Sequence, residues 1–264
     1  MNKVIRAEFG RTINAGLIIA IAGIIFSICF DSFNDLIAGL RNGQGYVGYF
    51  FSNAAFGGMC TKYMLPVFTA LPFSVSLCQE RNNKAVSYIV SREGKNRYIF
   101  AKFIVSAISG GFVAVCGTVL LFLMLAMRFP IAGDEFEGAV VSDYFHEWSA
   151  VYYPQLYILT LSILAFCRGV IWSSLALCVS LYTSDFMVVL LSPFLGSYVL
   201  VRIFQIIRVP DMVRPDMILI GQVVIKSSGV TLIIAIAISL TIVTLIGAFF
   251  VGKMREGLKS GTIY

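Results

Sequence analysis

Residues 79–102 read QERNNKAVSYIVSREGKNRYIFAK, and this segment lies between two apolar segments long enough to cross a bilayer. It carries six basic residues against two acidic ones, so the positive-inside rule places it in the cytoplasm. Within it, the run Ala85–Val90 spaces its apolar side chains along one face of a short helix. We interpret that face as a contact surface for a protein partner or for lipid.

The composition of the 264-residue chain is that of an integral membrane protein. Hydrophobic residues make up 58% of it, charged residues only 13%, and the mean hydropathy is +0.87, which leaves too little polar surface for a water-soluble domain. Uncharged runs of 19, 25 and 26 residues occupy 12–30, 103–127 and 227–252. Because a helix needs about 20 residues to cross about 30 Å of hydrocarbon, each run is a candidate span.

We predict an all-α integral membrane protein that forms a single domain over residues 1–264, with six spans. Three further segments complete the set: one extends outward past Lys62, one contains Arg168, and one contains Pro193 as a kink. The predicted spans are residues 14–30, 55–78, 103–127, 154–181, 186–204 and 229–252.

Charge predicts the orientation of these spans. The N-terminal arm, the loop after the second span, the turn between spans 4 and 5 and the tail together carry twelve basic and five acidic residues, whereas the opposite loops carry seven basic and nine acidic ones. We therefore predict a multi-pass protein of the cytoplasmic membrane with both termini cytoplasmic. The pI near 9.0 follows from this topology and requires no nucleic acid as partner. The arm, residues 1–11, separates apolar from basic side chains and suits a helix lying in the inner interface.

The sequence offers no catalytic, nucleotide or metal motif. Nothing matches G-x-x-x-x-G-K-[ST], and the single histidine, His146, has no second histidine or acidic cluster at helical spacing. The six cysteines form no C-x-x-C, and within spans they act as small apolar residues. We predict that the chain is not an enzyme and holds no metal or cofactor of its own.

The order of motifs resembles the permease subunits of ABC type-2 exporters. A basic arm and two spans precede Leu77-x-x-Glu80-Arg81, Ser91-Arg92-Glu93 and Arg97-Tyr98-Ile99-Phe100-Ala101-Lys102, which lead into the third span. Residues 175–185, LALCVSLYTSD, are similar to that family's tight cytoplasmic turn between spans 4 and 5. The resemblance covers the whole six-span layout. One departure is Asn83-Lys84, where many relatives carry glycine, and it leaves the start of the small helix open.

The resemblance implies a division of labour between chains. Two permease subunits, either two copies of this chain or this chain and a sibling, would form the pathway in the lipid bilayer, and two separate ATPase subunits would hold ATP and magnesium beneath them. The family's coupling helix, which contacts the ATPase, maps between spans 2 and 3 onto about Lys84 to Arg92. The predicted ATPase-binding residues are Glu80, Arg81, Lys84, Val86, Tyr88, Ile89, Arg92 and Arg97. A basic loop that serves topology alone is the alternative.

Spans 2 and 5 resemble the family's central interface, and Arg168 is the one ionisable residue near the middle of a span. The predicted substrate-path residues are Phe68, Phe73, Arg168, Met187 and Phe194. Ordinary helix packing is the alternative role for each. Residues 205–228 are expected to return into the membrane as short helices, as in the family. The predicted function is export of a peptide, lipid-like or drug-like substrate, and an ATP-independent six-span transporter or a peptide-immunity protein is the alternative.

Overall fold

The computed structural model describes residues 2–42, 47, 50, 58–131 and 153–260, and every regular element within them is a helix. The helices are α1 (Asn2–Thr12), α2 (Ala15–Asp31), α3 (Phe33–Asn42), α5 (Met59–Ala70), α6 (Ser76–Asn82), α7 (Val86–Glu93), α8 (Lys95–Ala126), α10 (Pro154–Val179), α11 (Phe186–Ile206), the 3₁₀ turn η3 (Asp211–Val213), α12 (Pro215–Ile220) and α13 (Ser228–Ser260). This confirms the all-α class. His146 lies outside the described residues.

Four of the described helices, α8, α10, α11 and α13, are long and apolar enough to cross a membrane. A fifth candidate is the pair α1 and α2, which are bent by 58° at their junction. The bend begins at Asn14, whose side chain accepts a hydrogen bond from Leu17 N at 3.1 Å and so caps α2. The chain is therefore a multi-pass membrane protein with four or five candidate spans in its described part.

The predicted span over residues 55–78 is not confirmed as one continuous helix. Residues 55–57 lie outside the described part, and α5 and α6 are separated by a turn over residues 71–75. Pro66 lies inside α5 and Pro72 lies in the turn. Proline has no amide proton to donate and its ring clashes with the preceding helical turn, so two prolines in this segment favour two short helices over one long one.

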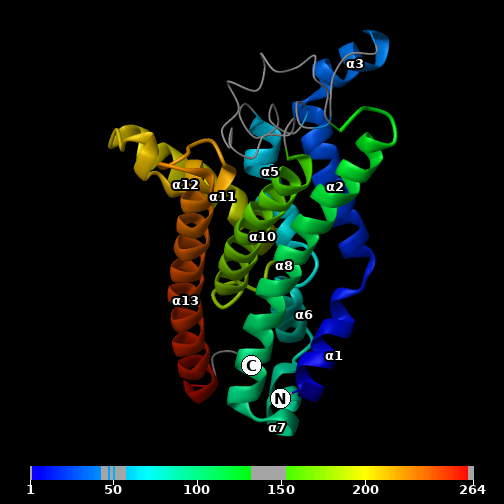
Figure 1. The fold of residues 1–264 in the computed structure, drawn as a ribbon. Helices are drawn as coiled ribbons and strands as arrows, with labels where there is room; N and C mark the ends of the chain where they lie inside the picture. The colour runs from blue at the N-terminus through cyan, green and yellow to red at the C-terminus, as the bar shows by residue number, and fades with distance from the viewer. Residues whose placement is uncertain (1, 43–46, 48–49, 51–57, 132–152, 261–264) are drawn as a thin grey trace.

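The two ends of the bundle differ in the segments they carry. Helix α1, helix α7 and the last turns of α13 lie at one end, and α3 and α12 lie at the opposite end (Figure 1). The three basic segments of the sequence, the arm, the loop after residue 78 and the tail, thus gather at the same end. We call this the basic end.

The centre of the bundle is the close contact between α8 and α10. A β-carbon at Gly110 would lie 2.4 Å from Cβ of Ser173 and 2.7 Å from the carbonyl oxygen of Gly169. Only glycine permits this approach. The hydroxyl of Ser74 adds a polar link beside it, at 3.1 Å from Oγ of Ser106 and donating to Ser173 O at 2.9 Å.

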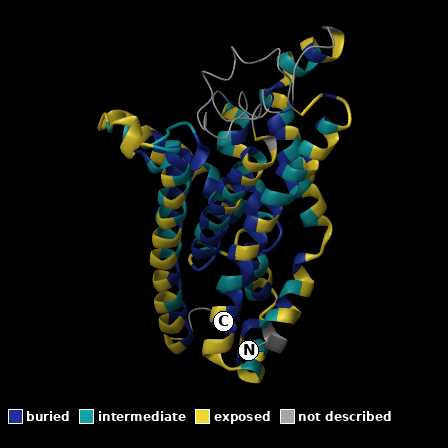
Figure 2. Ribbon diagram, viewed as in Figure 1, coloured by how far each residue is buried: buried dark blue, intermediate teal, exposed yellow. Residues whose placement is uncertain are grey.

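Helices α11 and α13 form the periphery of the bundle. In the most apolar window of α10, 61% is buried inside the chain, whereas the corresponding shares are 22% for α11 and 17% for α13. Figure 2 shows the exposed residues along the outer side of α13. These apolar faces must meet lipid or another membrane subunit.

The short helices expected within residues 205–228 are present as η3 and α12. Helix α12 ends at Gly221, whose φ of +88° is the left-handed conformation that favours glycine. Its residues Ile218, Leu219 and Ile220 are buried against the bundle. That this segment enters the bilayer stays a prediction.

Candidate functional site

A buried group of charges joins three helices at the basic end. Lys102 of α8 is fully buried, and its Nζ lies 2.6 Å from Oε1 of Glu80 on α6 and 3.1 Å from Oε2 of Glu8 on α1. Glu8 and Glu80 are themselves only 4% and 8% exposed. Removing charges from water is costly unless each is paired and hydrogen-bonded, so these contacts fix how the three helices approach one another.

Arg11 and Tyr98 complete this group, which we call the ion cluster. Arg11 donates to Oε1 of Glu80 at 2.6 Å and to Oε1 of Glu8 at 3.3 Å, and the Tyr98 hydroxyl donates to the other oxygen of Glu80. Two cations thus balance two anions. Local spacing places the pairs: Glu8 and Arg11 are three residues apart on α1, and Tyr98 and Lys102 are four apart on α8.

Glu80 was predicted to bind the ATPase, and the ion cluster was not predicted. Glu80 is instead held inside the chain by Lys102, Arg11 and Tyr98. The arm was predicted to lie as a helix in the inner interface, and in the structure the buried positions on α1 include Glu8 and Thr12. The one sequence feature that pointed to the ion cluster is Glu8, a glutamate inside an otherwise basic arm.

Arg81 also bonds within the chain. Its Nη1 donates to the carbonyl oxygens of Ser180 at 2.9 Å and Leu181 at 3.2 Å, at the end of α10. These carbonyls have no partner within the helix and attract a cation. The Arg81 guanidinium therefore ties α6 to the α10–α11 turn, and the contact of Arg81 with an ATPase stays a prediction.

Helix α7 turns its apolar face inward rather than toward a partner. Val86 and Val90 are 0% and 6% exposed and pack in a core that includes Leu177, Phe250 and Met254. The prediction that Val86 projects into a groove on an ATPase is wrong for this conformation. Residues of the chain's own helices α8, α10 and α13 share the core in which that face is buried.

The outer surface of α7 carries Tyr88, which is 77% exposed, with Ile89 partly buried beside it. The predicted contact residues Lys84, Arg92 and Arg97 are exposed, and Arg92 pairs with its neighbour Glu93 at 2.9 Å. Partner binding by these residues stays a prediction.

Lys84 explains where α7 begins. Its φ is +53°, in the left-handed region that glycine adopts without strain. Lysine here thus occupies a turn conformation that glycine would adopt without strain, and α7 starts two residues later at Val86. Gly94, with φ of +85°, ends α7 and begins α8.

The five predicted substrate-path residues do not line one cavity in the described part of the chain. Phe68 packs over Gly23 of α2, and Phe73 is buried with its ring centroid 4.9 Å from Nζ of Lys102. Met187 is 61% exposed in the first turn of α11, and Phe194 contacts the ring of Tyr63 on α5. Roles for these four in a pathway between subunits stay predictions.

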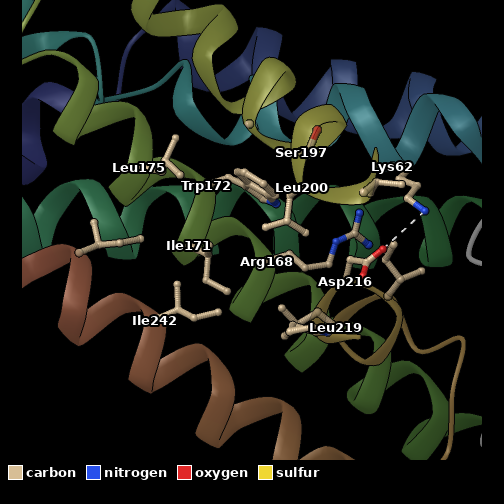
Figure 3. A pocket seen from close by; sticks show the side chains of 15 residues that line it. Lys62, Arg168, Ile171, Trp172, Leu175, Ser197, Leu200, Asp216, Leu219 and Ile242 are labelled. Atoms are coloured by element: carbon tan, nitrogen blue, oxygen red, sulfur yellow. Dashed lines mark ion pairs between the residues drawn. The ribbon is translucent and has the colours of Figure 1, made fainter. Parts of the chain in front are cut away.

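Arg168 faces a cavity of about 160 Å³ between α10, α11, α12 and α13 (Figure 3). Its Nη2 donates to the carbonyl oxygen of Thr61 at 3.3 Å, so the guanidinium lies against the backbone of α5. Lys62 and Asp216 lie at the same end of the cavity. No pattern in the sequence indicated that Lys62, on α5, would lie beside Arg168.

The comparisons with known proteins identify no family. No protein-family model matches the chain, and neither the curated proteins nor the solved structures include a match. Among the described residues, no group of three or more His, Cys, Asp or Glu side chains could hold a metal ion. Function must therefore be argued from the geometry.

Proposed function

We propose that this chain is the transmembrane subunit of an ABC transporter, exporting a peptide, lipid-like or drug-like substrate across the cytoplasmic membrane. In this proposal the chain crosses the membrane six times, with α5 and α6 together making the second crossing. The basic end faces the cytoplasm, and the chain pairs with a second permease. ATP is bound and hydrolysed on a separate ATPase subunit, because this chain carries no phosphate-binding motif.

The proposal rests on the contacts that hold α7 and the preceding helix α6 at the basic end. Helix α6, which precedes it, is tied to α1 and α8 by the ion cluster and to the α10–α11 turn by Arg81. The inner face of α7 lies in a core with residues of α6, α8, α10 and α13, and α7 packs against α8. A force applied to α7 from outside would therefore reach several spans at once.

The exposed side of α7 supplies a place for such a force. Tyr88 is an aromatic side chain with 77% exposure among basic neighbours, and tyrosine and arginine are the residues most enriched at energetic centres of protein interfaces. In the proposed cycle, ATP-driven closure of the partner dimer displaces α7 and shifts the spans between two packings.

One observation favours the ATP-independent alternative. The buried positions Val86 and Val90 show that the apolar face of α7 is satisfied within the chain. The argument that this face requires a partner therefore no longer applies, and the proposal depends on Tyr88 and the charges around it.

A first prediction tests the contact directly. The tagged chain would be co-expressed with the ATPase encoded by a neighbouring gene, and binding would be measured by co-purification in detergent. Tyr88→Asp should reduce recovery of the ATPase at least severalfold, because it places a carboxylate in the contact. Tyr182→Asp is the matched control, since Tyr182 is also exposed, at 66%, and lies in the α10–α11 turn.

Equal recovery with Tyr88→Asp and wild type would move the contact away from α7. The function itself is tested by substrate efflux from inverted vesicles with an ATPase whose hydrolysis is disabled. Efflux at the wild-type rate under that condition would exclude the ABC mechanism in favour of the ATP-independent one.

A further inference from the structure

The cavity at Arg168 has a charged end and an apolar end. Lys62, Arg168 and Asp216 lie at one end, next to α12, whereas Leu175 and Ile242 lie toward the other (Figure 3). The rise of a helix places Leu175 about 10 Å beyond Arg168 along α10. The long direction of the cavity thus follows the helices, with its polar end toward the end of the bundle that carries α12.

The charged end carries an excess of positive charge. Asp216 is engaged by Arg214, whose Nη2 lies 2.8 Å from Oδ2 and whose Nε lies 3.3 Å from Oδ1. This hydrogen bonding raises the pKa of Arg214 above its ordinary value. Lys62 reaches the same carboxylate only at 3.9 Å.

Arg168 has no acidic partner in the described part of the chain. Its guanidinium donates to the carbonyl oxygen of Thr61, and the ion pairs among the described residues do not include Arg168. A guanidinium offers five N–H donors in a planar fork that matches a phosphate or carboxylate. Together with Lys62, it leaves the polar end of the cavity complementary to an anion.

Two of the helices that line the cavity, α11 and α13, also form the apolar periphery of the bundle. Helices α11 and α13 both pack on α10 and scarcely touch each other, and both carry exposed apolar faces. The cavity volume of about 160 Å³ is below the roughly 300–1,000 Å³ of pockets that enclose a whole drug-sized ligand. An occupant of this cavity therefore extends beyond it, along apolar surface that lies next to lipid.

We propose that this cavity binds one anionic glycerophospholipid of the surrounding membrane. Its phosphate diester accepts hydrogen bonds from Arg168 and Lys62, and one acyl chain lies beside Trp172, Leu175 and Ile242. Polarity supports a lipid over a soluble anion, because the cationic end and the apolar end are arranged along the helix direction as the head and tail of a lipid are. The proposal does not rest on the transport function.

The test uses the full chain, purified in detergent and delipidated. It is titrated with a phosphatidylglycerol or with a phosphatidylcholine of the same acyl chains, and bound lipid is counted by native mass spectrometry. The wild-type chain should retain the phosphatidylglycerol preferentially. Arg168→Gln should weaken that retention about tenfold, the effect of losing one charge-assisted contact.

Arg202→Gln is the matched control. Arg202 is an exposed cation on α11, shortly after the cavity residues Leu200 and Val201, and its removal changes the net charge equally. It should leave retention unchanged. If Arg168→Gln does not fold, as judged by size-exclusion chromatography, Lys62→Gln provides the same comparison at the second cation.

Three results would overturn the proposal. Equal retention of the two lipids would exclude selection for an anionic headgroup. Equal losses of retention with Arg168→Gln and Arg202→Gln would reduce the effect to general surface charge. Displacement of the phosphatidylglycerol by inorganic phosphate alone, or by oleate at equal concentration, would assign the site to a free anion or a fatty acid. Resistance to both competitors supports the phospholipid.

Discussion

Lys102 has a different role in the structure from the one its position in the sequence suggests. In the sequence it ends a basic run and adds to the charge that orients the protein. In the structure its ammonium group is fully buried between Glu8 and Glu80. A buried ion pair gives little net stability over an apolar pair of the same shape, but removal of one member is costly because it leaves an uncompensated charge.

Lys102→Met should therefore destabilise the chain strongly. Glu8 and Glu80 would keep Arg11 as their one cation within the ion cluster, and breaking a buried pair costs about 3–5 kcal/mol. Arg11→Met is the control, since the Arg11 side chain is 53% exposed and pairs open to solvent contribute at most about 1 kcal/mol. Thermal unfolding in detergent measures both, and equal shifts would contradict the central place of Lys102 in the ion cluster.

Lys84 carries backbone strain at the start of α7, with φ of +53°. Lys84→Gly should raise the stability of the chain by up to about 1 kcal/mol, because glycine adopts this conformation without a steric penalty. Lys84→Ala removes the same charge and keeps the strain, so it should not stabilise. Hydrogen exchange of the α7 amides would show the difference, and equal protection in the two variants would argue against strain at this position.

At the scale of elements, the inward side of α7 was the main difference from expectation. The apolar face of a two-turn helix can be buried against a partner or against the rest of its own chain. The periodicity of the sequence is the same in both cases and does not distinguish them. Here the residues of α10 and α13 complete the same core as Val86 and Val90. What α7 presents to the outside is Tyr88 and basic side chains.

The contact of α8 with α10 should be intolerant of even one added methyl group. Gly110→Ala would place Cβ 2.4 Å from Cβ of Ser173, so the helices must move apart and thermal stability should fall by roughly 1–3 kcal/mol. Gly252→Ala, on α13, is the control: nothing lies within 4 Å of its β-carbon, and alanine favours a helix by up to about 1 kcal/mol. Similar stability of the two variants would mean that the helices do not pack this closely.

At the scale of the molecule, the common end of α1, α7 and α13 has a consequence for topology. If that end is cytoplasmic, reporter fusions after Arg92 and after Gly257 should both read cytoplasmic, and a fusion at Asp211 should read external. The charge balance provides the physical reason. An external signal after Gly257 together with a cytoplasmic one after Arg92 would require an odd number of crossings between them.

Hydropathy, charge and short-range periodicity were sufficient for the membrane class, the helix of the arm, α7 and the long apolar helices, because the bilayer acts on each segment according to its own composition. The turn between α5 and α6 was also signalled locally, by Pro66 and Pro72. No local pattern signalled the ion cluster, because Lys102 and Glu8 are 94 residues apart in the sequence. The packing of distant helices also decides which side of α7 faces inward. It likewise brings Lys62 and Arg168 to one cavity. Such contacts are a property of the packed bundle, in which each buried charge must find its partner.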